Sequence, residues 1–265
     1  MRGRPAEIAG GLHDFMTPKS TPRWVLIGGF ILAVIAGGIN AVGLLSVHRQ
    51  AFSHMTGNVT WVGLDLVGGD LAAAWHVLAV LLAFFVGCML SGFTLRETSA
   101  KLGRRYGMVL ALESALLFGA TFAMQGGLVA GEYLAAMACG LQNAMVTSYS
   151  GALIRTTHVT GMLTDLGIAL GHWMQGRPVD WRRVQLCVIL MSGFFVGCVL
   201  GGLGFHSMGY AALFWPAGFA GITGVGYGVL KHLDRHKMTA RVTRKLRPAV
   251  PRFVLKTLTR VAAEK

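Results

Sequence analysis

The sequence predicts an all-α transmembrane protein with six full membrane spans and two short re-entrant or broken helices. The chain of 265 residues is 54% hydrophobic and only 13% charged, which in a soluble domain would leave a large apolar surface in water. Its lysines and arginines gather at the termini and in two short connections. A polar motif also occurs twice between apolar runs, at residues 54–63 and 158–167.

The apolar runs define the six spans and divide the chain into four parts. Residues 1–23 form a basic leader, and the run after it is about 22 residues long, enough to cross a hydrocarbon core of about 30 Å. Residues 24–127 make a first membrane repeat and 128–231 a second, followed by a basic tail, 232–265. The tail is either a helix on the membrane surface or a flexible solvated segment. The expected spans are residues 24–45, 71–95, 107–125, 131–153, 184–205 and 210–230.

The motifs are followed by apolar segments, about 59–67 and 162–173, that are too short to cross a bilayer. If both crossed nevertheless, the basic loop 96–105 would face outward. If both re-enter, that loop, the link 177–183 and both termini face the cytoplasm, as the positive-inside rule favours. We therefore expect a multi-pass protein of the bacterial inner membrane, with three crossings in each half and the second half inverted relative to the first.

Internal similarity supports the two halves. Both motifs fit His-x-Thr-Gly-x-x-Thr-x-x-Gly, and Phe-Phe-Val-Gly-Cys occurs at 84–88 and again at 194–198. A weaker Asn-Ala pair occurs at 40–41 and 143–144. The three pairs follow the same order, which indicates an internal duplication.

The two short helices are expected to approach each other near the midplane and to line a hydrated cavity. Thr56 and Thr160 are expected to cap these helices, whose amino ends suit a solute that is anionic or accepts hydrogen bonds. At any single position, ordinary capping and packing is the competing interpretation. The expected substrate-binding residues are the polar and glycine positions of both motifs and three amides from the spans: His54, Thr56, Gly57, Asn58, Thr60, His158, Thr160, Gly161, Thr164, Asn40, Gln142 and Asn143.

Two further sets of residues have expected roles. Ionisable residues in or beside apolar segments are candidates for charge compensation or proton coupling, namely Asp65, Glu113, Arg155 and Asp165. Small residues at every fourth position indicate close helix packing, namely Ala83, Gly87, Ser91, Gly193, Gly197 and Gly201. The four cysteines lie in apolar runs, and no metal-ligand spacing or cofactor motif occurs, so no metal site and no cofactor are expected.

These features favour a channel or secondary transporter for a small solute. The alternative is a non-transporting membrane scaffold or sensor that acts through its basic tail. An enzyme is not expected, because no nucleophile–base constellation is recognisable. The net charge of +13 is assigned to contacts with anionic lipid headgroups rather than with nucleic acid. Formation of a homo-oligomer is left open.

At three stretches the chain resembles a known family. Residues 55–58 (Met-Thr-Gly-Asn), 140–144 (Gly-Leu-Gln-Asn-Ala) and 157–161 (Thr-His-Val-Thr-Gly) are similar to the hallmarks of the YoaK-like bacterial inner-membrane proteins, a family of unknown function. The resemblance covers residues 24–230 and implies a polytopic helical membrane protein, without a substrate. It also implies an acidic residue in the Gly-Gly-x-x-Ala region of the first span, where this chain has Asn40.

Overall fold

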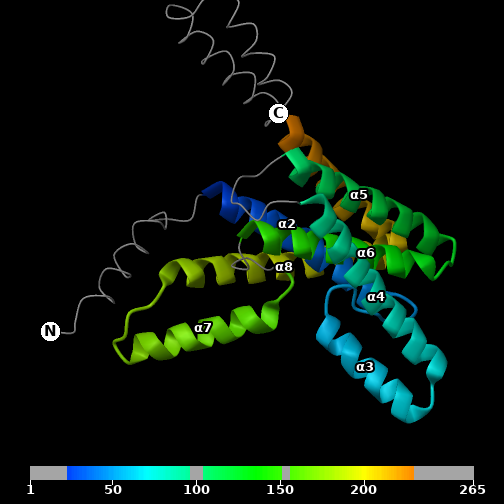
Figure 1. The fold of residues 1–265 in the computed structure, drawn as a ribbon, viewed down its shortest axis with the longest axis horizontal. Coiled ribbons are helices and arrows are strands. Elements are labelled where there is room, and N and C mark those ends of the chain that lie inside the picture. The colour runs from blue at the N-terminus through cyan, green and yellow to red at the C-terminus, as the bar shows by residue number, and fades with distance from the viewer. Residues whose placement is uncertain (1–22, 96–103, 151–155, 230–265) are drawn as a thin grey trace, which may run out of the picture.

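The computed structural model describes residues 23–95, 104–150 and 156–229, and these residues contain helices and no strand (Figure 1). The basic leader, the basic tail, most of the 96–105 loop and Arg155 lie outside the described residues. A further helix covers residues 214–229 and is called the closing helix below. The elements are α2 (Arg23–Leu45), α3 (Met55–Gly68), α4 (Leu71–Thr94), α5 (Arg104–Gln125), α6 (Ala130–Ser150), α7 (Val159–Met174), α8 (Trp181–Met208) and the 3-10 turn η1 (Gly209–Leu213).

Four stretches of the described chain are long and apolar enough to cross a membrane: Val25–Leu45, Leu71–Thr94, Arg105–Gln125 and Trp181–Val229. The fourth stretch has 49 residues and reverses direction at η1, so it contains both α8 and the closing helix. Helix α6 is not among the four because Glu132, Gln142 and Asn143 lower its mean hydropathy. Most of α6 is buried, which shows that it contacts other helices and has little surface to present to lipid.

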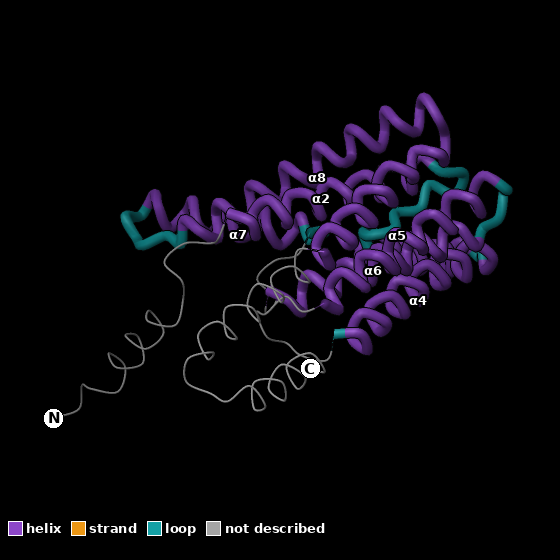
Figure 2. Tube along the Cα trace, turned by 90° about the horizontal axis from the view of Figure 1, so that it is seen from above, coloured by secondary structure: helices purple, strands orange, loops and turns teal. Residues whose placement is uncertain are grey.

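Two pairs of long helices pack side by side (Figure 2), and the contacts along each pair show that its helices run in the same direction. In the first pair, α2 and α8, Gly29 lies against Leu190, and Gly38 lies against Gly201 further along both helices. In the second pair, α4 and α6, the ring of His76 contacts Tyr133. Further along, the thiol of Cys88 lies 3.3 Å from the carbonyl oxygen of Gly140.

The other neighbours run antiparallel. Helix α5 packs on α6, with Gly119 against Leu134 and Gly131 against Met124. It also packs on the closing helix, where Tyr106 faces Tyr227 at one end and Phe122 faces Phe214 at the other. Helix α8 and the closing helix form a hairpin around η1. It follows that α2, α5 and α8 run one way, and that α4, α6 and the closing helix run the opposite way.

The small residues of the expected packing stripes lie in these interfaces. A Cβ atom on Gly87 of α4 would overlap the carbonyl oxygen of Met137 of α6, and a Cβ atom on Gly197 of α8 would overlap that of Val34 of α2. Gly193 and Gly201 also lie against α2, and the side chains of Ala83 and Ser91 are buried. The backbones of each parallel pair therefore approach as closely as small residues permit.

Candidate functional site

Each motif forms the start of one short helix, and the two starts have the same local structure. His54 and His158 are the N-cap residues of α3 and α7, and neither side chain caps through a hydrogen bond. Each ring folds back over the first helical turn, onto the glycine three residues later. A Cβ atom on Gly57 would lie 3.1 Å from His54 Nδ1, and one on Gly161 would overlap the His158 ring. The glycine of the motif therefore makes room for the histidine ring.

The threonines of the motifs have a different role from the expected one. Thr56 and Thr160 lie inside the first turn of α3 and α7 and do not cap these helices. Their carbonyl oxygens accept hydrogen bonds from the exposed hydroxyls of Thr60 (3.1 Å) and Thr164 (2.9 Å). The capping prediction was wrong because it applied the usual preference for threonine at an N-cap, whereas each helix begins one residue before its threonine and has the histidine at the N-cap.

The two motifs do not come together. Among the described residues α3 contacts α4 and α7 contacts α8, with no contact between α3 and α7, and Figure 1 shows the two short helices on different sides of the bundle. Each short helix folds back on the long helix that follows it. Positive φ angles at Gly69 (77°) and Gly176 (68°) allow these reversals. The structure thus places the motif residues at two separate positions, and the expected meeting of the motifs near the midplane does not occur.

Two of the expected amides hold an irregular segment inside the bundle. Residues 46–54 connect α2 to α3, and the side chain of Phe52 is fully buried. The side-chain oxygen of Asn40 accepts hydrogen bonds from the backbone N–H (3.2 Å) and hydroxyl (3.0 Å) of Ser53. The amide of Asn58 donates to the carbonyl oxygen of Ala51 at 2.8 Å. Irregular backbone in a membrane protein is tolerated where it is buried in this way.

The other two amides have unsatisfied atoms in the interior. Gln142 of α6 donates to the carbonyl oxygen of Leu32 of α2 at 3.1 Å. The side-chain oxygens of Gln142 and Asn143 are buried and make no hydrogen bond. Buried polar groups without partners are uncommon in folded proteins, so the middle of α6 is a candidate lining for a ligand or water.

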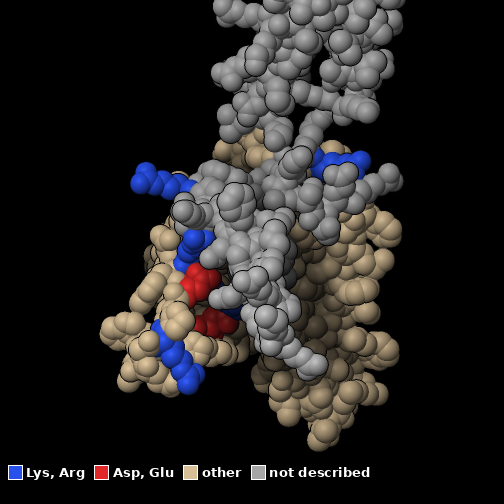
Figure 3. All heavy atoms as spheres, turned by 60° about the vertical axis from the view of Figure 1, so that its left-hand side comes forward, with Lys and Arg blue, Asp and Glu red and all other residues tan. Residues whose placement is uncertain are grey.

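The acidic candidates occupy different environments. Asp165 of α7 forms an ion pair with Arg183 of α8, in which Arg183 Nε and Nη2 lie 3.0 and 2.8 Å from one carboxylate oxygen. This pair borders a surface pocket between the two helices, which His172 and Asp180 also line. In Figure 3, which brings this side of the molecule forward, acidic and basic side chains lie next to each other. Asp65 is half-buried on α3.

Glu113 differs from the other acidic residues because it is fully buried. Its side chain is 0% exposed, and neither carboxylate oxygen makes a hydrogen bond. Gly119 of α5 packs against Leu134 of α6, and the two helices are antiparallel. Residues before Gly119 therefore lie beside residues after Leu134, which puts Glu113 level with the middle of α6. An ionisable side chain at that depth in an apolar bundle is a candidate functional position.

A further polar cluster lies at one end of the bundle and joins His48, His76 and Glu132, here called the His–His–Glu cluster. His48 Nδ1 lies 2.9 Å from one oxygen of Glu132, and His76 Nε2 lies 3.0 Å from the other. The side chain of Glu132 is 4% exposed, that of His76 16% and that of His48 43%. The cluster is therefore anchored on a buried carboxylate and reaches the surface through one imidazole.

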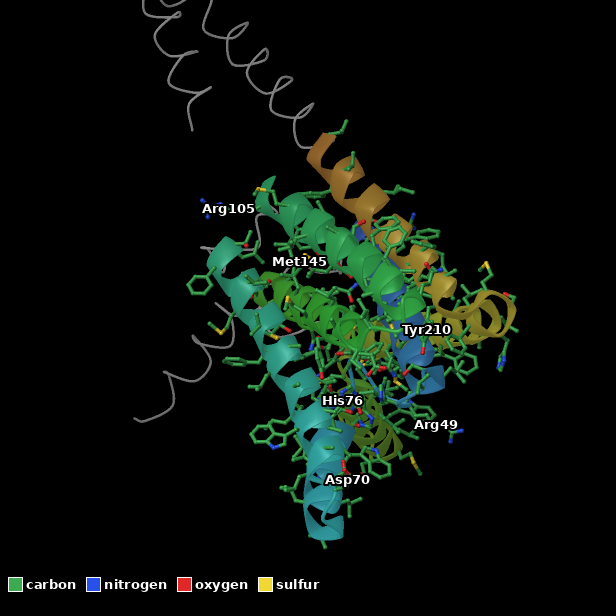
Figure 4. All side chains as sticks on the ribbon, turned by 90° about the vertical axis from the view of Figure 1, so that its right-hand side faces the viewer. Arg49, Asp70, His76, Arg105, Met145 and Tyr210 are labelled. Carbon is green, nitrogen blue, oxygen red and sulfur yellow. The ribbon has the colours of Figure 1, made fainter. Side chains whose placement is uncertain are left out.

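Three elements bring this cluster together. His48 follows α2, His76 lies in the second turn of α4, and Glu132 lies in the first turn of α6. The hydroxyl of Tyr133 lies 3.2 Å from His76 Nδ1, and the backbone N–H of Val47 donates to the hydroxyl of Tyr210 at 3.3 Å. In Figure 4, His76 and Tyr210 lie toward this end of the bundle, near Arg49. Tyr133 and Tyr210 thus position the ring of His76 and the segment that carries His48.

Comparison with known proteins identifies the family. Residues 28–226 match the model of the family described as protein of unknown function DUF1275. The chain belongs to this family. It is also 29% identical over 192 residues to a UPF0700 transmembrane protein of Rhizobium meliloti (strain 1021), a match that covers 70% of this chain and 78% of the relative. No solved structure matches the chain. This DUF1275 protein is an integral membrane protein of a family of unknown function, and its described residues fold into helices.

The sequence of this DUF1275 chain does not by itself predict the His–His–Glu cluster. His48 and Glu132 are 84 residues apart, and no local spacing connects the three residues. One signal was available in the sequence, since His76 and Glu132 are ionisable residues just inside apolar runs, where such residues have functional roles more often than elsewhere.

Proposed function

We propose that this DUF1275 protein is a secondary transporter for a small polar solute, and that Glu113 carries the coupling proton. The observation behind this proposal is the buried, unpartnered carboxylate of Glu113 in the middle of α5. A buried carboxylate without a partner is costly whether it is charged or neutral. A protein retains such a group where protonation and deprotonation are part of its cycle, as in the proton relays of membrane transporters.

The helix directions support the transporter class. The three long helices of the first half, α2, α4 and α5, correspond in chain order to α6, α8 and the closing helix of the second. Each helix runs in the opposite direction to its counterpart. Each half also packs on the other in the same way. The first helix of one half packs on the second helix of the other, α2 on α8 and α6 on α4. We therefore propose six crossings in two inverted halves, in the bacterial inner membrane with both termini in the cytoplasm. This plan is common among secondary transporters.

The charges of the interior favour one class of solute. Every arginine whose side chain the structure describes is exposed, whereas Glu113 is buried level with the unsatisfied amide oxygens of α6. These groups are a carboxylate and hydrogen-bond acceptors, which suit a solute with N–H donors, either neutral or cationic. The proposed solute is therefore a small amine or amide rather than an anion, which departs from the expectation drawn from the short helices.

Proton-coupled flux provides the test. The full chain is reconstituted in vesicles that contain a pH-sensitive dye, and methylammonium, urea, alanine and acetate are added separately from outside. We expect at least one of the first three solutes to change the internal pH at a rate above that of protein-free vesicles, with no such response to acetate. The variant Glu113→Gln is expected to lose this coupled proton movement, because the amide cannot take up or release a proton at neutral pH.

Two further variants complete the experiment. Asp70→Asn removes an exposed carboxylate that caps α4 while preserving a capping side chain, so it should transport as the wild type does. Deletion of residues 235–265 tests the scaffold alternative and should leave flux intact. Coupled proton movement in Glu113→Gln equal to that of the wild type would rule out Glu113 as the coupling residue. Absence of a response to methylammonium, urea and alanine, with or without a response to acetate, would contradict this solute class.

A further inference from the structure

The His–His–Glu cluster is not used in the proposed transport step, and its chemistry points to a separate role. Its three side chains offer two imidazole nitrogens and a carboxylate, and the ligand atoms lie within 4.8 Å of one another. A tetrahedral zinc ion with bonds of about 2.1 Å keeps its ligand atoms roughly 3.4 Å apart. The observed spacing is therefore close to that of a zinc site, and a small inward movement of one side chain would complete it.

We propose that the His–His–Glu cluster binds a divalent transition-metal ion of the zinc class through His48 Nδ1, His76 Nε2 and the carboxylate of Glu132. Imidazole nitrogens together with one carboxylate are ligands that zinc accepts readily. The alternative is that Glu132 only forms ion pairs with the two histidines, without an ion.

The contact between His76 and Glu132 leaves room for an ion in place of a proton. His76 Nε2 and a Glu132 oxygen form an ion-pair contact of 3.0 Å, and both atoms are buried with no further hydrogen-bond partner. The other ring nitrogen of His76, Nδ1, lies 3.2 Å from the Tyr133 hydroxyl. When Nδ1 donates its proton to that hydroxyl, Nε2 carries a lone pair that faces the carboxylate. A cation between these two atoms would remove the repulsion between them.

The surroundings of the ligands also match known metal sites. A histidine that binds a metal usually has its other ring nitrogen held by a hydrogen bond, which fixes the tautomer and orients the ring. Tyr133 supplies that contact to His76, and the hydroxyl of Ser46 lies 3.4 Å from the Glu132 oxygen that faces His48. The site thus has supporting contacts to two of its three ligands.

The cluster supplies three ligands, and His48 is partly exposed. Structural zinc sites use four protein ligands, whereas sites that exchange a ligand keep one position open. A fourth position beside the partly exposed His48 would take a water molecule to complete the coordination. The ion would connect the segment after α2 to the amino-terminal turns of α4 and α6, so its binding should stabilise this end of the bundle. This inference does not depend on the proposed transport function.

Metal binding to the full chain in detergent tests the proposal. The protein carries a tag without histidine, is treated with a chelator and is then dialysed against micromolar Zn²⁺, and the bound metal is measured by elemental analysis. We expect one ion per chain and a higher thermal unfolding temperature with Zn²⁺ present. Co²⁺ in place of Zn²⁺ should give the visible absorption of a tetrahedral site.

Variants separate this site from general binding of metal by surface histidines. His48→Ala changes a partly exposed side chain and should fold normally, and Glu132→Gln removes the anionic ligand; each should weaken Zn²⁺ binding at least tenfold. Tyr133→Phe should weaken it by about tenfold or more through the ring of His76. His206→Ala removes an exposed histidine of α8 and should leave affinity unchanged. Failure of the wild type to retain Zn²⁺ would overturn the proposal, as would equal affinity in His48→Ala, His206→Ala and the wild type.

Discussion

The close contact between α4 and α6 gives a sharp test of the fold. Gly87 lies where the backbones of the two helices approach, and a Cβ atom there would overlap the Met137 carbonyl oxygen and lie 2.9 Å from the Leu141 nitrogen. Both of these neighbours are backbone atoms and cannot rotate away. The variant Gly87→Ala must therefore push the helices apart along their interface.

Two opposing effects determine the size of the change in stability. Alanine is favoured over glycine in a helix by up to about 1 kcal/mol. Overpacking of a tight interface typically costs about 1–3 kcal/mol, and a clash with rigid backbone places Gly87→Ala toward the upper part of that range. We expect a net loss of about 1–2 kcal/mol. Gly92 lies on the same helix with nothing within 4 Å of a Cβ atom, so Gly92→Ala should be neutral or slightly stabilising.

Thermal unfolding in detergent micelles, followed by the helical circular dichroism signal, measures this difference. For a chain of this size, about 1 kcal/mol shifts the unfolding temperature by roughly 2–4 °C, so Gly87→Ala should unfold several degrees below Gly92→Ala. The α2–α8 pair provides an independent repetition, in which Gly197→Ala is compared with its unobstructed neighbour Gly202→Ala. An unfolding temperature of Gly87→Ala equal to or above that of Gly92→Ala would contradict the close packing of α4 against α6.

Three further predictions concern the irregular segment, the surface ion pair and the topology. Asn40→Ala leaves the buried N–H and hydroxyl of Ser53 without their acceptor, which should lower the free energy of unfolding by about 1–3 kcal/mol in the same thermal assay. Asp165→Asn breaks an exposed ion pair and should change stability by less than about 1 kcal/mol, with a larger loss indicating that the pair is more buried than the structure shows. In a background without the four native cysteines, Asp70→Cys and Gln175→Cys should react with a membrane-impermeant thiol reagent from opposite sides of the membrane; labelling from the same side would contradict the inverted halves.

The long helices could be predicted from the sequence because each one coincides with an apolar run that ends at a polar residue or a glycine. The expected span 24–45 corresponds to α2 (Arg23–Leu45), and the span 71–95 corresponds to α4 (Leu71–Thr94). Asp70 marks the start of α4, since its side chain accepts a hydrogen bond from the Ala73 backbone at 2.9 Å. Hydrophobicity and capping are local properties, and a single sequence contains both.

The lateral positions of the short helices could not be predicted in the same way. The repeated motif describes how α3 and α7 begin, with a histidine ring folded over a glycine, but it does not specify which surface each helix packs against. That choice follows from the tight reversals at Gly69 and Gly176, which return the chain along α4 and α8. The prediction that the motifs meet assumed that two short segments entering from opposite faces of an inverted repeat would converge at the midplane. The structure instead gives each motif its own place beside a long helix.

The two proposed sites, Glu113 and the His–His–Glu cluster, are far enough apart to be tested separately. Glu132 lies in the first turn of α6, whereas Glu113 is level with the middle of that helix. At 1.5 Å per residue this separation is about 12–15 Å along the bundle. The two positive charges of a Zn²⁺ ion at that distance change the energy of the Glu113 carboxylate by about 2–3 kcal/mol at an effective dielectric constant of about 20. A metal ion at the cluster would therefore lower the proton affinity of Glu113 without contacting its carboxylate. Glu132→Gln should weaken Zn²⁺ binding at least tenfold while coupled flux persists, and Glu113→Gln should abolish coupled flux while Zn²⁺ still binds.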